Sequence, residues 1–413
     1  MKSIDFEYGD KDNGWIETDV ASFAPFVYGK SLPEDRRSLH GQVPVYGSNG
    51  VIGFHDTPLV SNPTVVIGRK GTVDAVHFCK SGCWPIDTTF YFTDTDLEST
   101  RYAYYVLKSL GLNKMNSDSA VPGLNRDNAH TRIIRIPTST TEQRRIAHIL
   151  GTLDDKIENN RKTAKTLEAM AQAIFKSWFV DFDPVRAKMA GESRESICKR
   201  LKITPEILDL FPDRLVDSEL GEIPEGWEVG TIIDIATISS GKRPENRLER
   251  PSEDAHIPLW GGNGPIGFVT EPLIYESCIL TGRVGTLGTF FRINTPCWPS
   301  DNTLIIRAIK NAYYEYVFFN ISQIDMTLLN RGSTQPLLTQ SDLSSQPIVI
   351  PSSDIIGSFH DVSYTLLQYA NFFSLNYSYV VIARDTLLPK LISGEIRVPE
   401  AKYCVEAAMS GEV

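Results

Sequence analysis

The chain contains an internal repeat, and this constrains its fold more than any other feature. Residues 257–268 repeat seven of the twelve residues at 43–54, at an offset of 214. The same offset holds over about 95 residues, and it aligns Gly68-Arg69 with Gly282-Arg283, Thr72 with Thr286, Cys83-Trp84-Pro85 with Cys297-Trp298-Pro299, and Pro122 with Pro336. This period is far too long for a solenoid or propeller unit, so the chain holds a duplicated domain. Copy one occupies residues 1–140 and copy two residues 222–352.

The two copies share scaffold residues and differ in charged residues. The matched positions are mostly Gly, Pro, Trp and Phe, which form turns, close backbone approaches and aromatic cores. Basic residues of copy one face uncharged residues of copy two: Lys70 faces Val284, Lys80 faces Asn294, and Arg126 faces Gln340. The pattern predicts one fold that carries two different surfaces.

Each copy shows short strands and turns together with a short helix. Strands are expected at 65–67 and 89–92 in copy one, and at 279–280 and 303–306 in copy two. A helix is expected at 100–110, with its counterpart at 312–323. We therefore predict an α+β fold with two duplicated, mixed and mostly β domains.

A long amphipathic helix is predicted after each copy, at 141–180 and at 353–393. Ser139 and Glu142 have the spacing of a capping box, and the absence of Pro over 138–183 allows a helix of about 60 Å at 1.5 Å per residue. Each helix has a single apolar stripe, formed by Ile146, Ile149, Leu153, Ile157, Leu167 and Ile174, and by Phe359, Val362, Leu366, Phe373, Val380 and Leu387. Two such stripes would bury each other in an antiparallel coiled coil that separates the copies. The alternative is that each helix packs on its own domain.

The remaining segments are a connector and a tail. Residues 181–221 contain Pro184, Pro205 and Pro212, and we interpret them as a connector. A short helix is expected within it, at 194–201. Residues 394–413 follow the second long helix and are expected to be a loosely held tail.

Composition limits the partners and the compartment. The net charge is −10, from 41 Lys and Arg against 51 Asp and Glu, so a DNA-binding surface must be a local patch on an acidic body. The six Cys lie far apart, which favours reduced thiols over a disulfide framework. No apolar run approaches the ~20 residues of a membrane span, and Met1–Glu7 lack the apolar core of a secretory signal. We expect a cytoplasmic protein with no membrane partner.

No motif of a known catalytic or cofactor site is found. The chain lacks a phosphate-binding loop, a zinc-protease His-Glu-x-x-His, a nucleophile elbow, and the Asn-Pro-Pro-aromatic motif of amino-methyltransferases. Residues 262–267 fit Gly-x-Gly-x-x-Gly but open no helical pattern, so we interpret them as a turn. His77, Cys79 and Cys83 could supply metal ligands, but copy two has Phe and Ile at the first two positions, which favours buried thiols. We predict no catalytic residue, no metal and no cofactor.

Three segments resemble the specificity subunits of type I restriction-modification enzymes. Residues 142–157, Glu-Gln-Arg-Arg-Ile-Ala-His-Ile-Leu-Gly-Thr-Leu-Asp-Asp-Lys-Ile, are similar to the helix opening of that family. Residues 175–185 and 388–396 are similar to its central and C-terminal signatures, and the Gly-Asn-Gly and Gly-Arg-x-Gly-Thr turns resemble those of its target-recognition domains. The second helix opening, 354–359, lacks the usual Glu-Gln pair, so its partner contacts are expected to differ.

The resemblance implies a non-catalytic role in DNA recognition. Each copy would be a target-recognition domain for one half of a bipartite target in double-stranded DNA, and the helix pair would set the distance between the halves. Two methyltransferase subunits would dock on this frame, and motor–nuclease subunits would join them. Half-sites on one face of a duplex need two binding domains at a fixed separation. A pseudo-twofold axis also offers equivalent places to two identical partners.

The candidate DNA contacts are basic residues of the two copies. Arg69 and Arg283 occupy matched turns, where a guanidinium could reach a phosphate or a guanine edge, or could instead be salt-bridged within the turn. The other candidates are copy-specific basic residues, for each of which a solvated surface charge is the alternative: Lys30, Arg36, Arg37, Lys70, Lys80 and Arg126 in copy one, and Lys242, Arg243, Arg247, Arg250, Arg292 and Arg331 in copy two.

Two other functions compete with DNA recognition. An interaction scaffold, with two ligand-binding domains on a coiled-coil spacer and no DNA role, would suit the acidic charge, but the helix signatures oppose it. An enzyme with an unfamiliar site is opposed by the lack of catalytic motifs. Binding to random duplex DNA in the presence of a methyltransferase partner would separate the DNA-binding protein from the scaffold.

Overall fold

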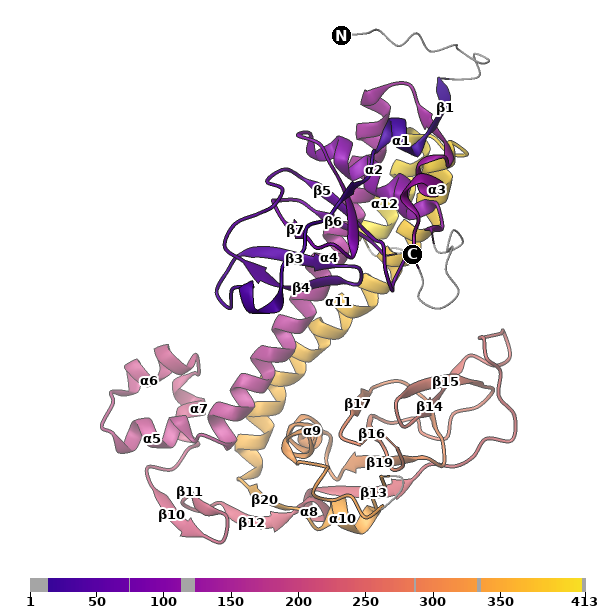
Figure 1. Ribbon diagram of the computed structural model, residues 1–413. Coiled ribbons are helices and arrows are strands. Elements are labelled where there is room, and N and C mark those ends of the chain that lie inside the picture. The colour runs from indigo at the N-terminus through magenta and orange to yellow at the C-terminus, as the bar shows by residue number, and fades with distance from the viewer. Residues whose placement is uncertain (1–13, 74, 113–122, 286, 333–335, 411–413) are drawn as a thin grey trace. The chain divides into compact units, whose positions relative to one another are not determined.

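The computed structural model describes residues 14–73, 75–112, 123–285, 287–332 and 336–410 (Figure 1). It divides the chain into two compact units: unit 1 comprises Met1–Lys162 with Phe373–Val413, and unit 2 comprises Thr163–Phe372. The unit boundaries fall inside the long helices, and the segment boundaries predicted from the sequence remain a proposal. Three features used in the sequence predictions, Met1–Glu7, Pro122 and Thr286, lie outside the described residues.

Copy one, in unit 1, is built from small sheets with short helices beside them. Its elements are β1 (Trp15–Asp19), α1 (Val20–Phe23), β2 (Val27–Tyr28), a 3-10 turn (Glu34–Arg36), β3 (Val43–Gly47), β4 (Gly50–His55), β5 (Thr64–Gly68), β6 (Val76–Cys79), β7 (Trp84–Pro85), β8 (Thr89–Thr93), α2 (Leu97–Ser109), α3 (Arg126–His130) and β9 (Ile133–Pro137). The sheet orders are β2-β8-β5-β6, β4-β3-β7 and β1-β9. Strand β5 is buried along its whole length, and α2 packs against it.

Copy two, in unit 2, repeats the order of the strands and α-helices of copy one, but its 3-10 turn lies before α9 and not before the first hairpin strand. Its elements are β12 (Glu228–Thr231), α8 (Ile232–Ile235), β13 (Ala236–Ser240), β14 (Ile257–Gly261), β15 (Gly264–Val269), β16 (Cys278–Gly282), β17 (Phe290–Ile293), β18 (Trp298–Pro299), β19 (Thr303–Ala308), a 3-10 turn (Asn311–Tyr313), α9 (Tyr314–Gln323), α10 (Gln340–Ser344) and β20 (Pro347–Ile350). The sheet orders are β13-β19-β16-β17, β15-β14-β18 and β12-β20. The prediction of a duplicated, mixed and mostly β domain is confirmed.

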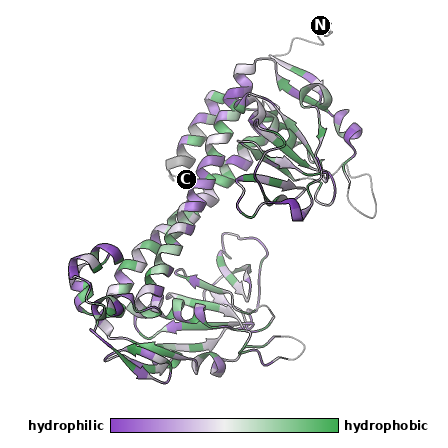
Figure 2. Ribbon diagram, turned by 60° about the vertical axis from the view of Figure 1, so that its left-hand side comes forward, coloured by the Kyte–Doolittle hydropathy of each residue, from purple (hydrophilic) through white to green (hydrophobic). Residues whose placement is uncertain are grey.

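Local sequence explains where the elements of each copy begin. Helix α2 starts three residues before the predicted position because the Asp96 carboxylate accepts the Ser99 N–H at 2.9 Å and caps the first turn. The Ser99 hydroxyl, which donates to the same carboxylate, lowers the pKa of Asp96, and the Ser99 N–H adds to this effect. Hydrophobic and polar residues are mixed along the ribbons of both copies (Figure 2), whereas the central strands β5 and β16 are buried along their whole length.

Two long helices, α4 (Thr140–Phe179) and α11 (Ser353–Ser393), match the predicted positions. In unit 1 the Asn160 amide donates to the Asn376 Oδ1 at 2.6 Å, and Arg384 donates to the Asp154 carboxylate at 2.8 Å. Residue numbers rise along α11 as they fall along α4, so the helices pack antiparallel. The predicted antiparallel pairing is therefore confirmed.

The apolar stripes lie between the paired helices, but α11 carries more apolar residues than one stripe. In unit 2 the rings of Phe175 and Phe359 lie 5.9 Å apart. All of the predicted stripe residues are buried or half-buried: Ile146, Ile149, Leu153, Ile157, Leu167, Ile174, Phe359, Val362, Leu366, Phe373, Val380 and Leu387. The expectation of a single stripe is wrong for α11, which also exposes Tyr364, Tyr369, Leu375, Tyr379 and Ile382.

The helix ends belong to the cores of the two copies. In unit 1, Ile146 of α4 and Leu391 of α11 are buried in one cluster with the apolar residues of copy one. In unit 2, Phe175 and Trp178 of α4 and Phe359 of α11 are buried in one cluster with copy two. Both arrangements considered from the sequence therefore occur. The two helices pair with each other, and their ends also pack on the two copies.

The connector forms three short helices and a hairpin in unit 2. They are α5 (Asp183–Met189), α6 (Arg194–Leu201), α7 (Pro205–Asp209), β10 (Leu215–Ser218) and β11 (Gly221–Pro224). Helix α6 is the helix predicted at 194–201. Val185, Ile197 and Leu208 of these helices are buried in the core of unit 2. The connector is therefore a packed part of the unit.

The segment after Gly394 differs from its prediction. It forms helix α12 (Val398–Ser410), and its Val398 and Ala401 are buried against the core of unit 1. The expectation of a loosely held tail is wrong, because burial of this short apolar face holds the helix in place. No helix among the described residues has the length and hydropathy of a membrane span.

Candidate nucleic-acid interface

Arg69 and Arg283 lie in turns with the same backbone hydrogen bonds. The Arg69 N–H donates to the Thr88 carbonyl at 2.9 Å, and the Arg69 carbonyl accepts the Leu124 N–H at 2.9 Å. Arg283 makes the same pair of bonds at the corresponding positions of copy two, at 3.0 and 2.8 Å. The two guanidinium groups are therefore presented from equivalent points of one frame.

A Gly-Lys dipeptide occupies a second equivalent position in the two copies. Alignment at the single offset of 214 does not pair the two dipeptides. The Trp84 indole donates to the Lys30 carbonyl at 2.9 Å, and the Trp298 indole donates to the Lys242 carbonyl at 2.7 Å. These contacts make Lys30 equivalent to Lys242, at an offset of 212. The prediction that both lysines are copy-specific is wrong.

The glycine before each lysine is required by a close backbone approach. A Cβ on Gly29 would lie 2.1 Å from the Ile86 carbonyl oxygen, and a Cβ on Gly241 would lie 2.2 Å from the Ser300 carbonyl oxygen. Neither backbone oxygen can move away without breaking the turn. The glycines thus place the residues on either side of them at the same point in each copy.

Arg37 and Arg247 are a third equivalent pair. Each precedes a residue that bridges to the second hairpin strand, since Ser38 pairs with Phe54 and Leu248 pairs with Phe268. The segment between the Gly-Lys dipeptide and this bridge is two residues shorter in copy two. Alignment at the single offset of 214 therefore does not pair Arg37 with Arg247. The prediction that Arg37 and Arg247 are copy-specific is wrong.

We call Tyr28, Arg69 and Arg126 site 1. The guanidinium carbon of Arg69 lies 5.0 Å from the centre of the Tyr28 ring, and that of Arg126 lies 5.2 Å from it. Arg69 also donates to the Asp87 carbonyl at 3.0 Å, and Arg126 pairs with Asp127 at 3.2 Å. With Lys70, these residues line a hollow of about 250 Å³. The structure thus brings together three of the predicted basic residues.

The equivalent residues in copy two, Ser240, Arg283 and Gln340, form site 2. Gln340 donates to the Ser240 hydroxyl at 2.8 Å, and Arg283 approaches the same hydroxyl at 3.5 Å. Arg283 Nε is buried and has no acceptor among the residues that the structure describes. The salt bridge within the turn that was considered for both arginines is absent from the described part of each site. Site 2 therefore has the same backbone arrangement as site 1, but the neighbours of its arginine, Ser240 and Gln340, are both uncharged.

Sequence reasoning missed Tyr28 and Ser240, which stand at the centre of the two sites. Each directly precedes the Gly-Lys dipeptide of its copy, so alignment on that dipeptide would have found the pair. Tyr28 is 47% exposed, although Arg69 and Arg126 both lie over its ring. Tyr28 is the last residue of strand β2 and Ser240 is the last residue of strand β13, and each strand pairs with the central part of its sheet.

Other predicted basic residues are engaged with their own copy. Lys80 pairs with Asp155 of α4, and Arg331 pairs with the Asp342 carboxylate at 2.5 Å. The Thr339 hydroxyl and Arg331 both lower the pKa of Asp342. Arg292 lies over the Phe318 ring at 5.5 Å. These contacts favour a structural role for the three basic residues.

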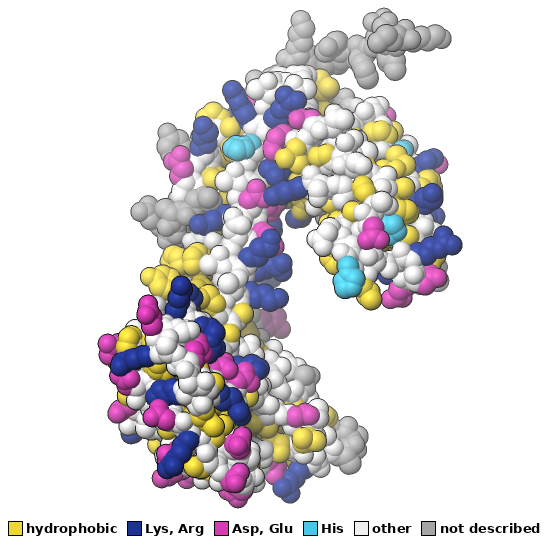
Figure 3. Space-filling view, turned by 90° about the vertical axis from the view of Figure 1, so that its left-hand side faces the viewer, with side chains coloured by type: hydrophobic (Ala, Val, Ile, Leu, Met, Phe, Trp, Pro, Cys, Tyr) yellow, Lys and Arg dark blue, Asp and Glu magenta, His cyan; other side chains and the backbone are white. Residues whose placement is uncertain are grey.

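The remaining candidates are exposed charges. Arg36, Arg243 and Arg250 form no ion pair with any described residue. They stand before the first hairpin strand of their copy, on the same segments as Arg37 and Arg247. On the face drawn in Figure 3, Lys and Arg side chains are interspersed with Asp and Glu, so positive charge gathers only locally.

The segment that resembles a helix opening anchors copy one on α4. The Asp154 carboxylate accepts the Tyr105 hydroxyl at 2.6 Å, and burial together with this negative charge raises the pKa of Tyr105. Arg101 packs against Gly151, where a Cβ would lie 2.2 Å from the Arg101 Nη1. Gly151 and Asp154 of this segment therefore contact the side chains of Arg101 and Tyr105 on α2.

Comparison with known proteins agrees with this duplicated frame. The family model described as the type I restriction modification DNA specificity domain matches residues 13–169 and again residues 224–384, which together exceed half of the chain. The chain belongs to this family. It is a specificity subunit of the type I restriction-modification class, with two recognition domains, and a specificity subunit is the non-catalytic component of such a system.

Relatives of this specificity subunit carry the same description. The type I restriction enzyme HindI specificity subunit of Haemophilus influenzae is 26% identical over 332 residues, which cover 67% of this chain and 71% of that protein. The MjaIX specificity subunit of Methanocaldococcus jannaschii is 26% identical over 367 residues, 82% and 78% of the two chains. The crystal structure of a type I S subunit from M. genitalium shares the fold, with a TM-score of 0.66 at 17% identity over 92% of this chain and 97% of that chain.

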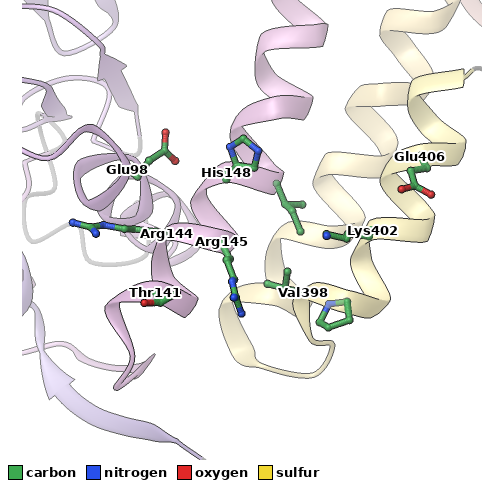
Figure 4. Close-up of a pocket in the computed structure, with 10 residues that line it drawn as sticks. Glu98, Thr141, Arg144, Arg145, His148, Val398, Lys402 and Glu406 are labelled. Atoms are coloured by element: carbon green, nitrogen blue, oxygen red, sulfur yellow. The ribbon is translucent and has the colours of Figure 1, made fainter.

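A groove of the specificity subunit lies between α4 and α12, and it shares no lining residue with the hollow of site 1 (Figure 4). It measures about 880 Å³, and its lining includes Arg144, Arg145 and His148 of α4 with Lys402 of α12. Arg144 pairs with Asp96 at 3.1 Å. No cluster of three or more metal-ligating side chains occurs among the described residues, and His77, Cys79 and Cys83 do not form one.

Proposed function

We propose that each recognition domain binds one half of a bipartite target in double-stranded DNA. The single observation that carries this proposal is the equivalence of sites 1 and 2. One backbone frame presents an arginine in both copies, while its neighbours are Tyr28 and Arg126 in one and Ser240 and Gln340 in the other. A constant frame with changed side chains is what two different half-sites on one duplex require.

The paired helices α4 and α11 set the distance between the half-sites in this proposal. They run antiparallel in each unit, and their ends are built into the cores of both domains. A domain that shares a core with a helix end moves with that helix. Half-sites separated by a fixed number of base pairs need such a connection.

Two methyltransferase subunits dock on the helix pair, and motor–nuclease subunits join them. The exposed apolar side chains of α11 support this part of the proposal. Tyr369 is 58% exposed in unit 2, and Leu375 and Ile382 are each 62% exposed in unit 1. Exposed apolar patches of this kind mark protein–protein contacts.

The proposal is tested by the methylation pattern of a host that carries this chain with its methyltransferase subunit. We expect sequencing of methylated bases to yield one motif with two specified halves and an unspecified spacer. A host with the methyltransferase subunit alone is the control, and it should lack this motif. A continuous motif would contradict the bipartite target, and the absence of any motif would favour the interaction scaffold without a DNA role.

Docking is tested on the exposed face of α11. Replacement of Leu375 and Ile382 by Ser should lower co-purification of the methyltransferase subunit at least tenfold, because two exposed apolar contacts are lost. The matched control is Ser374→Ala with Ser378→Ala, also exposed on α11. Equal recovery of the partner with both variants would exclude this face as the docking surface.

A further inference from the structure

Sites 1 and 2 occupy the same position relative to the backbone but differ in two of their three side chains. The arginine is common to both, whereas Tyr28 corresponds to Ser240 and Arg126 corresponds to Gln340. The match extends to the bridges beside each site, because Lys70 pairs with Gly123 and Val284 pairs with Leu337. The difference between the sites is therefore one of side-chain chemistry on a shared frame.

The varied side chains are not needed to fill a core. Tyr28 and Gln340 are exposed, and Arg126 is 38% exposed. The Ser240 hydroxyl, which replaces the phenol ring, holds the Gln340 amide at 2.8 Å, so each site keeps its own internal contact. Because each set of side chains makes its own contacts on the same backbone, the folded domain can tolerate either set.

The two sites offer different groups to a base. Site 1 presents two guanidinium groups around an aromatic ring, and guanidinium donors pair best with the O6 and N7 acceptors of guanine. Site 2 presents the amide of Gln340, and a Gln amide pairs best with the N6 and N7 of adenine.

We infer that residues 28 and 126 select a base in one half of the DNA target, and that residues 240 and 340 select the corresponding base in the other half. The constant arginines, Arg69 and Arg283, orient this contact in both halves. The inference rests on the proposed function and specifies which residues set the sequence. Site 1 favours guanine at its position, and site 2 favours adenine.

The test exchanges the side chains between the sites in the full chain, co-expressed with its methyltransferase subunit. One variant carries Tyr28→Ser with Arg126→Gln, and the reciprocal variant carries Ser240→Tyr with Gln340→Arg. Methylated motifs are read from the host genome. We expect the first variant to shift one position of one half from guanine toward adenine, with at least a tenfold change in preference. The reciprocal variant should shift the other half in the opposite direction.

A matched control exchanges exposed residues of the same domain away from site 1. Ser61→Tyr with Asn62→Glu introduces the residues found at 275 and 276 in copy two, and it should leave both halves of the motif unchanged. Arg126→Gln alone provides a milder change at the exposed edge of site 1, and thermal melting checks that each variant is folded.

The outcomes separate the two proposals. If the unmodified chain yields no bipartite motif, the proposed function itself fails. If it yields a bipartite motif that neither exchange nor Arg126→Gln alters, the proposed function stands and this inference is overturned. A shift confined to one half in each exchange supports the assignment of these four residues.

Discussion

Arg36 and Arg37 are neighbours in the chain, but they are held differently. Arg36 ends a 3-10 turn, is exposed, and forms no ion pair with the described residues. Arg37 is half-buried, and its Nη1 donates to the Ile52 carbonyl at 3.2 Å, which ties it to strand β4. A charge change at Arg37 would therefore disturb the hairpin, whereas one at Arg36 tests surface charge alone.

Arg36→Glu is expected to weaken target binding and to flatten its dependence on salt. Loss of one phosphate contact reduces the slope of log K against log salt concentration by about 0.9, because fewer counterions are released. The measurement is a titration of the assembled complex with target DNA at several salt concentrations. Lys199→Glu, an exposed lysine of the connector helix α6, makes the same charge change as a control. Identical affinity and slope for Arg36→Glu would remove Arg36 from the interface.

Single-residue predictions succeeded where turn chemistry was explicit. The matched Gly-Arg turns correctly marked Arg69 and Arg283 as equivalent, since their flanking glycines repeat at one offset. Lys30 and Arg37 were misassigned because their true offsets, 212 and 210, differ by two and four residues from the offset of 214 that holds over residues 43–137. A single sequence shows such shifts only after the backbone contacts are known.

Asn160 and Asn376 form a buried polar pair between two otherwise apolar helix faces. Both side chains are almost fully buried, and each amide has the other as a partner at 2.6 Å. A buried polar pair of this kind favours one register of paired helices at some cost in stability. It lies in unit 1, between the Asp154–Arg384 pair and the end of that unit.

Replacement of one asparagine is expected to destabilise the protein more than replacement of both. Asn160→Leu alone leaves the Asn376 amide buried without its partner, at a cost of about 1–3 kcal/mol. The double change to Leu removes both polar groups and should recover most of that loss. Chemical denaturation of the wild type, both single variants and the double variant gives the coupling energy. Additive losses would show that the pair is not coupled.

The helices that were predicted correctly are those whose own residues form a clear apolar pattern. Helices α4 and α11 were located within one residue, because a 3.6-residue apolar period runs for about forty residues. Helix α12 was missed, since the buried residues that are described in it, Val398 and Ala401, give no clear period in so short a segment. The second apolar face of α11 was not predicted, because its residues, such as Leu375 and Ile382, lie outside the period of the first stripe.

At the scale of the whole molecule, the sequence could not show that the helix ends belong to the domain cores. The cluster of unit 2 joins Phe175 and Trp178 to Tyr316 and Phe359, residues far apart in the chain. Such contacts depend on tertiary packing, which a period or a motif does not reveal. They bear on the proposed function, in which the length of the paired helices sets the distance between the half-sites.

A matched insertion in both helices is expected to lengthen the spacer of the DNA target. Seven residues added after Lys162 and seven after Phe372 extend the pair by about 10.5 Å at 1.5 Å per residue. This length corresponds to about three base pairs at 3.4 Å each. The methylated motif should therefore gain unspecified positions, and affinity should fall because the duplex also twists. The control is the same insertion after Gly191 in the connector. An unchanged spacer in the helix variant would contradict the proposal that the paired helices set the distance between the half-sites.

The shared cores also constrain how such genes can recombine. A crossover at the edge of a domain, near residue 140 or 352, would separate Ile146 or Phe359 from the side chains that it is packed against. Joints near residues 162 and 372 would instead transfer each domain together with its own helix ends. Chimeras that inherit a new half-specificity and still fold are therefore expected to have their junctions in the middle of the paired helices.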